Sequence, residues 1–113
     1  MRWIVLLALL ASACAKGAEA DLPAISQARS LGAEWALVNE QANRGRLTSI
    51  YTQTMRKQLR DQLESTARSL KQPDSRYGAE IRALLALPES APPDALRAHS
   101  GQLKQIEDSL ESA

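Results

Sequence analysis

Apolar residues at helical spacing are the feature that most limits how this 113-residue chain can fold. After residue 20 they recur at steps of three and four, the interval that places side chains on one face of an α-helix. No segment alternates apolar and polar residues over the length of a strand, and Leu, Ala, Gln, Glu and Arg, which enter helices at little cost, dominate. The pattern predicts an all-α fold, a small antiparallel helical hairpin or bundle of three to four helices.

Gly and Pro residues divide the expected helical domain, residues 21–113. The first helix is expected to begin at Asp21, as an acidic cap ahead of Pro23, and to end near Gly45. A second helix is expected from Leu47 to Lys71; the alternative is one long helix through Gly45, at a cost of about 1 kcal/mol. The apolar stripes of these two helices are Ala24, Ala28, Leu31, Trp35, Val38 and Ala42, then Leu47, Tyr51, Met55, Leu59, Leu63, Ala67 and Leu70.

Two further helices are expected after Pro73, which cannot continue a helix. The third spans Arg76 to Leu87, and prolines at 88, 92 and 93 then separate it from a last helix that opens at Asp94. The last stripe is Leu96, His99, Leu103, Ile106 and Leu110. We expect His99 to be a packed or half-buried member of that stripe.

Charge is distributed unevenly although the whole chain carries only +1. The segment Arg44–Arg76 holds eight basic and three acidic residues, whereas residues 77–113 hold three basic and six acidic ones. The first and last helices are therefore expected to lie beside the basic second helix. Solvated helix faces are one account of these charges, and contact with anionic lipid, glycan or a partner is the other.

The first fourteen residues form a separate unit with the pattern of a secretory signal. Arg2 precedes an apolar run from Trp3 to Ala11, and small residues then lead to Cys14. The run is too short for a transmembrane helix, which needs roughly 20 apolar residues. The pattern predicts that the protein is exported from the cytoplasm.

The segment L-A-S-A-C resembles the lipobox of bacterial lipoproteins, with a departure at Ala11, where that family usually has Leu. The resemblance implies that residues 1–13 are removed as a signal peptide after Ala13. Cys14 would then carry diacylglycerol on its sulfur and a fatty acyl group, such as palmitate, on its new amino group. Residues 14–20 would form the tether. Acylation would also account for a lone Cys in an exported protein, where free thiols invite unwanted pairing.

The resemblance places the protein in the bacterial cell envelope, anchored to the membrane and facing the periplasm. By analogy with the family, Ala15 after the Cys favours the outer membrane. The alternative is cleavage after Ala18-Glu19-Ala20, an A-x-A site that would discard Cys14 and leave a soluble periplasmic protein.

Catalytic and metal-binding patterns are not evident in the sequence. His99 has no second His or Cys at ligand spacing, and its neighbour Ser100 points elsewhere on a helix. Glu107 and Glu111 share a helix face, for which solvation is the simpler reading. We therefore expect no enzyme activity, no metal and no cofactor.

Five residues are candidates for binding a partner: Trp35, Tyr51, Arg56, Lys57 and Arg60. Aromatic and Arg side chains dominate protein interfaces, although core anchoring is the alternative for the two aromatics. Export argues against nucleic acid as the partner of the basic cluster. The expected function is a membrane-anchored, non-enzymatic interaction or assembly module that binds an envelope protein or a second copy. The alternatives are a binding protein for peptidoglycan or another anionic ligand, and a small lipoprotein of the exclusion or immunity type.

Overall fold

The computed structural model describes residues 17–113, so the signal sequence, its cleavage site and Cys14 lie outside the described residues. Within that range the chain forms the 3-10 turn η1 (Glu19–Asp21), four α-helices and no strand. The helices are α2 (Leu22–Asn43), α3 (Ser49–Arg68), α4 (Arg76–Leu85) and α5 (Pro93–Glu111). The all-α prediction is confirmed.

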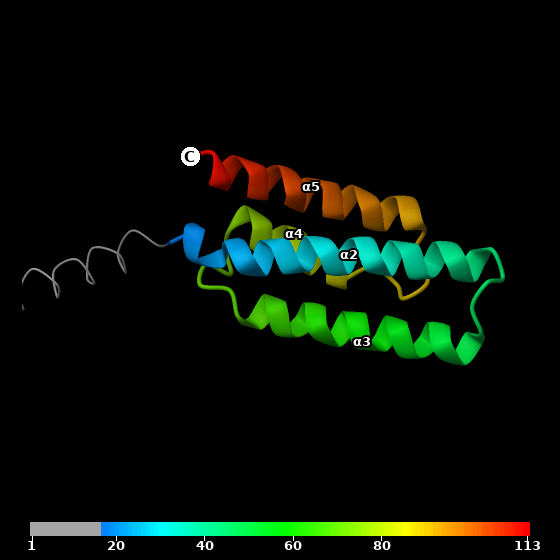
Figure 1. Ribbon diagram of the computed structural model, residues 1–113. Coiled ribbons are helices and arrows are strands. Elements are labelled where there is room, and N and C mark those ends of the chain that lie inside the picture. The colour runs from blue at the N-terminus through cyan, green and yellow to red at the C-terminus, as the bar shows by residue number, and fades with distance from the viewer. Residues whose placement is uncertain (1–16) are drawn as a thin grey trace, which may run out of the picture.

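The three long helices lie side by side, with α2 between α5 and α3 (Figure 1). The short helix α4 packs against α5 and α3 and covers one face of this layer. The first helix, α2, lies beside the basic helix α3, as the charges predicted, but the acidic helix α5 packs on α2 and α4 instead. The buried apolar side chains of α5, Leu96 and Leu103, belong to the same core cluster as those of α2.

The hydrophobic core is centred on α2, whose Trp35 side chain is completely buried. The other three α-helices contribute to the same cluster, so the described chain has a single core. Its buried apolar members are Ile25, Ala28, Leu31, Trp35, Ala36 and Val38 from α2, with Leu59, Leu63, Leu70, Tyr77, Ile81, Leu84, Ala91, Leu96 and Leu103 from the rest of the chain.

The break between α2 and α3 falls at Gly45, as predicted. Its φ of 69° lies in the left-handed region, which glycine adopts without the strain that a Cβ would cause. The Arg46 N–H then donates to the Gln41 carbonyl at 3.0 Å, which satisfies one of the open carbonyls at the end of α2. Thr48 begins α3 as its N-cap, since its hydroxyl accepts from the Tyr51 N–H at 3.1 Å.

Helix α3 ends at Arg68, earlier than the predicted Lys71. The Ser69 hydroxyl donates to the Thr66 carbonyl at 2.7 Å and closes the helix before Pro73 is reached. Ser75 then caps α4 by accepting from the Gly78 N–H at 3.1 Å. The helix boundary predicted at Pro73 therefore lies within a loop, residues 69–75, that joins α3 to α4.

Asp21 does not cap α2, so that part of the prediction was wrong. Its carboxylate, 1% exposed, instead accepts from the N–H groups of Lys71 at 2.8 Å and Gln72 at 2.9 Å and from the Tyr77 hydroxyl at 2.5 Å. Burial acts to raise the pKa of Asp21, but these hydrogen bonds together outweigh it and lower the pKa below its usual value. Burial, followed by the bond to Asp21, raises the pKa of Tyr77 to about 12.

Candidate functional site

Two of the predicted partner-binding residues meet inside the protein, beside the connection between α4 and α5. Trp35 is 0% exposed, and its Nε1 donates to the Glu89 carbonyl at 2.9 Å. The Arg60 guanidinium lies over the Trp35 ring, 5.5 Å from the ring centroid, close enough for a cation–π contact. The Arg60 Nη1 and Nη2 atoms also donate to the carbonyls of Leu87 at 2.9 Å and Leu85 at 3.3 Å.

Asn39 completes this arrangement and was not predicted. Its Nδ2 donates to the carbonyls of Glu89 at 3.0 Å and Ala91 at 2.9 Å, and its Oδ1 accepts from Arg56 Nε at 2.7 Å. The side chain is only 1% exposed. A signal was available, because Asn39 follows Trp35 by four residues and therefore shares its buried face.

These contacts assign internal roles to three of the five candidates. Trp35 is a core anchor, the alternative considered for it, and is inaccessible to a partner in the folded protein. Half-buried Arg60 binds carbonyls at the end of α4 and in the loop that follows. Arg56, also half-buried, holds Asn39, whose side chain binds two further carbonyls of that loop. Only Tyr51 and Lys57 remain as predicted residues on the open surface.

Two of the three exposed large apolar side chains in the described part of the chain lie at the start of α3, and the third, Leu37 on α2, is 52% exposed. Tyr51 is 50% exposed, and its neighbour Ile50, which was not predicted, is 78% exposed. Arg44 and Arg46 are also exposed in the turn just before them. The stripe that contained Tyr51 advances in four-residue steps, each about 40° beyond a full turn, so Tyr51 is rotated away from the core. Leu47, which precedes the helix, still packs against the core. We call residues 43–51 the hairpin tip.

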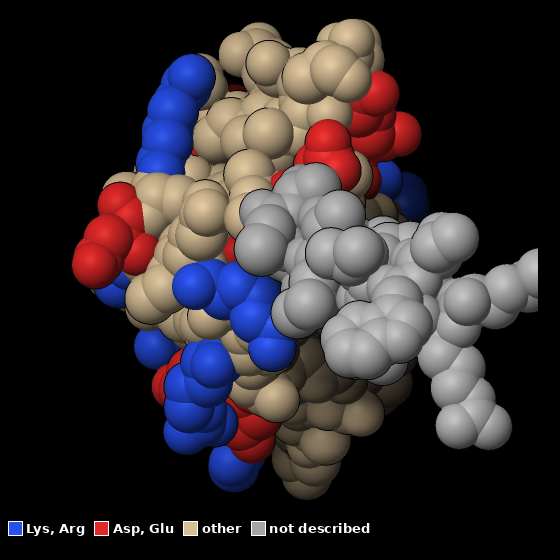
Figure 2. Space-filling view, turned by 90° about the vertical axis from the view of Figure 1, so that its left-hand side faces the viewer, with Lys and Arg blue, Asp and Glu red and all other residues tan. Residues whose placement is uncertain are grey.

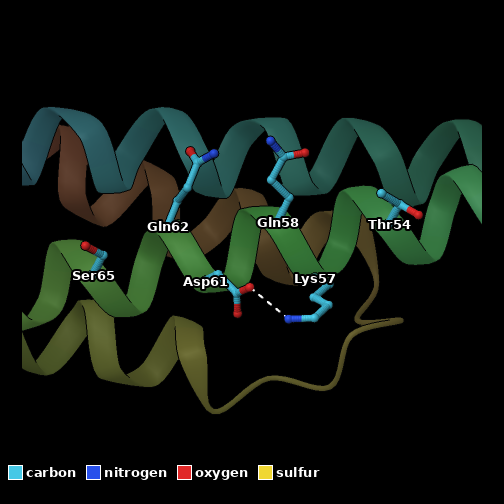
Figure 3. A pocket seen from close by; sticks show the side chains of 6 residues that line it. All are labelled: Thr54, Lys57, Gln58, Asp61, Gln62 and Ser65. Carbon is cyan, nitrogen blue, oxygen red and sulfur yellow. Dashed lines mark hydrogen bonds and ion pairs between the residues drawn. The ribbon is translucent and has the colours of Figure 1, made fainter.

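Lys57 belongs to the outer face of α3, which Figure 3 shows from close by. Its Nζ forms an ion pair with Asp61 at 2.9 Å, while Gln58 and Gln62 extend along the other side of the helix. The bond to Asp61, helped by its negative charge, raises the pKa of Lys57. A hollow of about 480 Å³ lies here, lined by Thr54, Lys57, Gln58, Asp61, Gln62 and Ser65. Its lining comes from a single helix, so it is a shallow surface feature with no convergent catalytic groups.

Polar contacts account for most of the other titratable side chains that the sequence singled out. His99 is half-buried, as expected, and its Nδ1 lies 2.5 Å from Glu80 Oε1 on α4. Glu107, Asp108 and Glu111 bring carboxylate oxygens within 4.8 Å of one another. Glu107 is bonded to Arg29 Nε at 2.9 Å and so links α5 to α2, whereas Asp108 pairs with Lys104 Nζ at 3.3 Å within α5.

Between residues 17 and 113, no helix combines the length and the apolar character needed to cross a membrane. Comparison of the chain with protein-family models, with curated proteins and with solved structures found no significant match.

Proposed function

We propose that the protein is a bacterial envelope lipoprotein, anchored through acylated Cys14, whose helical domain is a non-enzymatic interaction or assembly module. The N-terminal sequence is the observation that carries this proposal. Arg2, the apolar run and the small residues before Cys14 match the order of a lipoprotein signal. Several acyl chains on one residue give a stable membrane attachment, whereas one chain alone is marginal.

The fold supports an orientation for such an anchored domain. Cys14 precedes η1 by only a few residues, so an acylated Cys14 would keep the η1 end of α2 close to the membrane. The 22 residues of α2 span about 33 Å and carry the chain to the hairpin tip. The tip would therefore face away from the anchoring membrane, where another envelope protein is accessible.

The chemistry of the hairpin tip supports a protein partner. Ile50 and Tyr51 offer apolar contact area, and Arg44 and Arg46 lie beside them. Aromatic and Arg side chains commonly supply most of the binding energy at the centre of an interface. The expected partner surface is an apolar depression with acidic residues around it, on an envelope protein or on a second copy.

The intact mass of the protein purified from its host tests the anchor. A chain that begins at Cys14 and carries acyl groups is the expected result. A chain that begins at Asp21 without acyl groups would instead establish the soluble periplasmic alternative.

Site-specific crosslinking in living cells tests the interaction surface independently. A photoreactive amino acid at Ile50 is expected to give one reproducible crosslinked product, and the same probe at Gln102, exposed on α5, serves as the matched control. A product of twice the chain mass would identify self-association. Equal, diffuse labelling from both positions would refute a specific role for the hairpin tip.

A further inference from the structure

A groove between α2 and α5 has a composition unlike the other hollows of the described surface. It encloses about 320 Å³ and brings together three cationic side chains and three small residues. No Asp or Glu is among the described residues that line it. The lining residues are Arg29 and Ala33 from α2, and Arg97, Ser100, Gly101 and Lys104 from α5.

Carboxylates outside the groove hold its cations in place. Arg29 uses Nε to bind Glu107 at 2.9 Å, which leaves its two terminal amino groups without a hydrogen-bond partner in the described part of the chain. Arg97 donates from Nη2 to Glu40 at 2.6 Å, and its Nη1 lies 3.8 Å from Asp94 Oδ1, beyond hydrogen-bond distance. The bond and charge of Arg97 lower the pKa of Glu40. Because each pair uses only part of the guanidinium, both arginines keep N–H donors for an anion.

Lys104 supplies the third positive charge. Its Nζ lies 3.3 Å from Asp108 Oδ1, a long contact between two well-exposed side chains. Arg97 and Lys104 are seven residues apart on α5, and thus about 10 Å apart along its axis. The cations therefore flank both ends of the groove.

Gly101 lies at an open position of the groove. A Cβ at this position would meet nothing within 4 Å, so no close contact requires glycine here. Gly32 differs, because a Cβ there would overlap the Ser100 hydroxyl. Glycine is a poor helix former, and an exposed one in the middle of α5 calls for a reason other than packing.

Ser100 supplies an independent observation. The residue is only 6% exposed, and its Oγ is a buried side-chain oxygen with no hydrogen-bond partner among the described residues. A buried hydroxyl without a partner is uncommon and unfavourable. Ser100 lines the groove, but its Oγ lies against Gly32 of α2, so a change of its χ1 rotamer is the step that would bring this donor to a bound oxygen.

We propose that the groove between α2 and α5 binds a phosphate group. The two guanidinium groups, the ammonium and the hydroxyl all donate hydrogen bonds, and a phosphate offers several acceptor oxygens to meet them. A soluble phosphate ester and the headgroup of an anionic phospholipid present the same chemistry. This site is separate from the hairpin tip and does not depend on the protein having a partner there.

Titration of the isotope-labelled protein, as its host cells produce it and in neutral detergent, tests the proposal. We expect inorganic phosphate and glycerol phosphate to shift the amide resonances of Ser100 and Gly101 saturably at constant ionic strength. Chloride at the same ionic strength should not. Equal shifts with chloride would overturn the proposal.

Substitutions at Gly101 provide a matched pair. Gly101→Glu places a carboxylate in the open groove and is expected to abolish the saturable shift, whereas Gly101→Ala, which adds only a methyl group, should retain it. Both replace glycine with a better helix former, so circular dichroism should show an intact fold. Arg97→Gln should weaken binding about tenfold through loss of a charged donor.

Mixed micelles distinguish the two sources of phosphate, because the acyl anchor proposed for this protein would attach it to vesicles of any lipid. Saturable shifts of Ser100 and Gly101 when phosphatidylglycerol, but not phosphatidylcholine, is added to the detergent micelles, with loss in Gly101→Glu, would assign the site to a lipid headgroup. Saturable shifts with glycerol phosphate, without a response to phosphatidylglycerol, would assign it to a soluble ester. Absence of both responses, or responses unchanged in Gly101→Glu, would overturn the proposal.

Discussion

The two ends of α2 are fastened in different ways. At the η1 end, the buried Asp21 carboxylate accepts three hydrogen bonds from residues about fifty positions later in the chain. At the hairpin tip, the contacts around Gly45 are local, and Ile50 and Tyr51 remain exposed. Long-range hydrogen bonds therefore fix the η1 end, whereas apolar side chains remain exposed to solvent at the hairpin tip. The difference separates a structural end from an end suited to binding.

The largest effect is expected from Asp21→Asn. The amide keeps the size of the carboxylate but turns one acceptor into a donor, which then faces other donors from Lys71, Gln72 or Tyr77. Leaving buried donors unsatisfied should lower the free energy of unfolding by about 3 kcal/mol, measured by urea denaturation. Asp74→Asn, at an exposed position nearby, is the control and should change little. Equal losses in both variants would refute the special role of Asp21.

Alkaline pH should reduce the stability that the Tyr77–Asp21 hydrogen bond contributes at the η1 end of α2. The pKa of Tyr77 is raised from 10.0 to about 12 in the folded protein, so the fold favours the protonated hydroxyl that donates to Asp21. The contribution of this hydroxyl to the free energy of unfolding is complete below pH 10. It declines above that pH because the unfolded chain loses the proton first, and it is lost by about pH 12. Urea midpoints across this range should fall more steeply in the parent than in Tyr77→Phe.

Acid acts on the carboxylate itself. Because the pKa of Asp21 is lowered from 3.8 on folding, its contribution is present above that value and is lost as the pH falls through the folded pKa. Asp21→Asn should remove this part of the acid dependence and leave the rest. Identical acid profiles in the parent and Asp21→Asn would contradict the assignment.

At the hairpin tip, the effect of Gly45→Ala should be smaller. A Cβ meets no neighbour there, but the left-handed φ of 69° is unfavourable for alanine by about 1 kcal/mol. Gly101→Ala is the matched comparison, since it removes glycine from a regular helix and should raise stability by about 0.5–1 kcal/mol. Thermal unfolding of both variants checks the opposite signs.

The sequence predicted local features better than long-range polar ones. Four helices, the break at Gly45 and the core position of Trp35 follow from apolar spacing and from backbone preferences, which act over a few residues. Asp21 was expected to cap its own helix, and its true partners are distant in the chain. Arg56 and Arg60 were expected on the surface because Arg usually is, yet their partners are Asn39 and the loop after α4.

The exposure of Ile50 could have been predicted because this residue lies outside the apolar stripe of the second helix, but its role in binding depends on a molecule outside this chain. Ile50→Ser should change the free energy of unfolding by no more than about 0.5 kcal/mol, because the side chain is already 78% exposed. Crosslinking from a probe at Tyr51 should nevertheless fall sharply in this variant if the tip is a contact surface. Gln102→Ser, at an exposed position on α5, should leave that crosslink intact. Unchanged crosslinking in Ile50→Ser would mean that the contact does not depend on the exposed isoleucine, and the functional distinction between the two ends of α2 would then rest on Tyr51 and the neighbouring arginines alone.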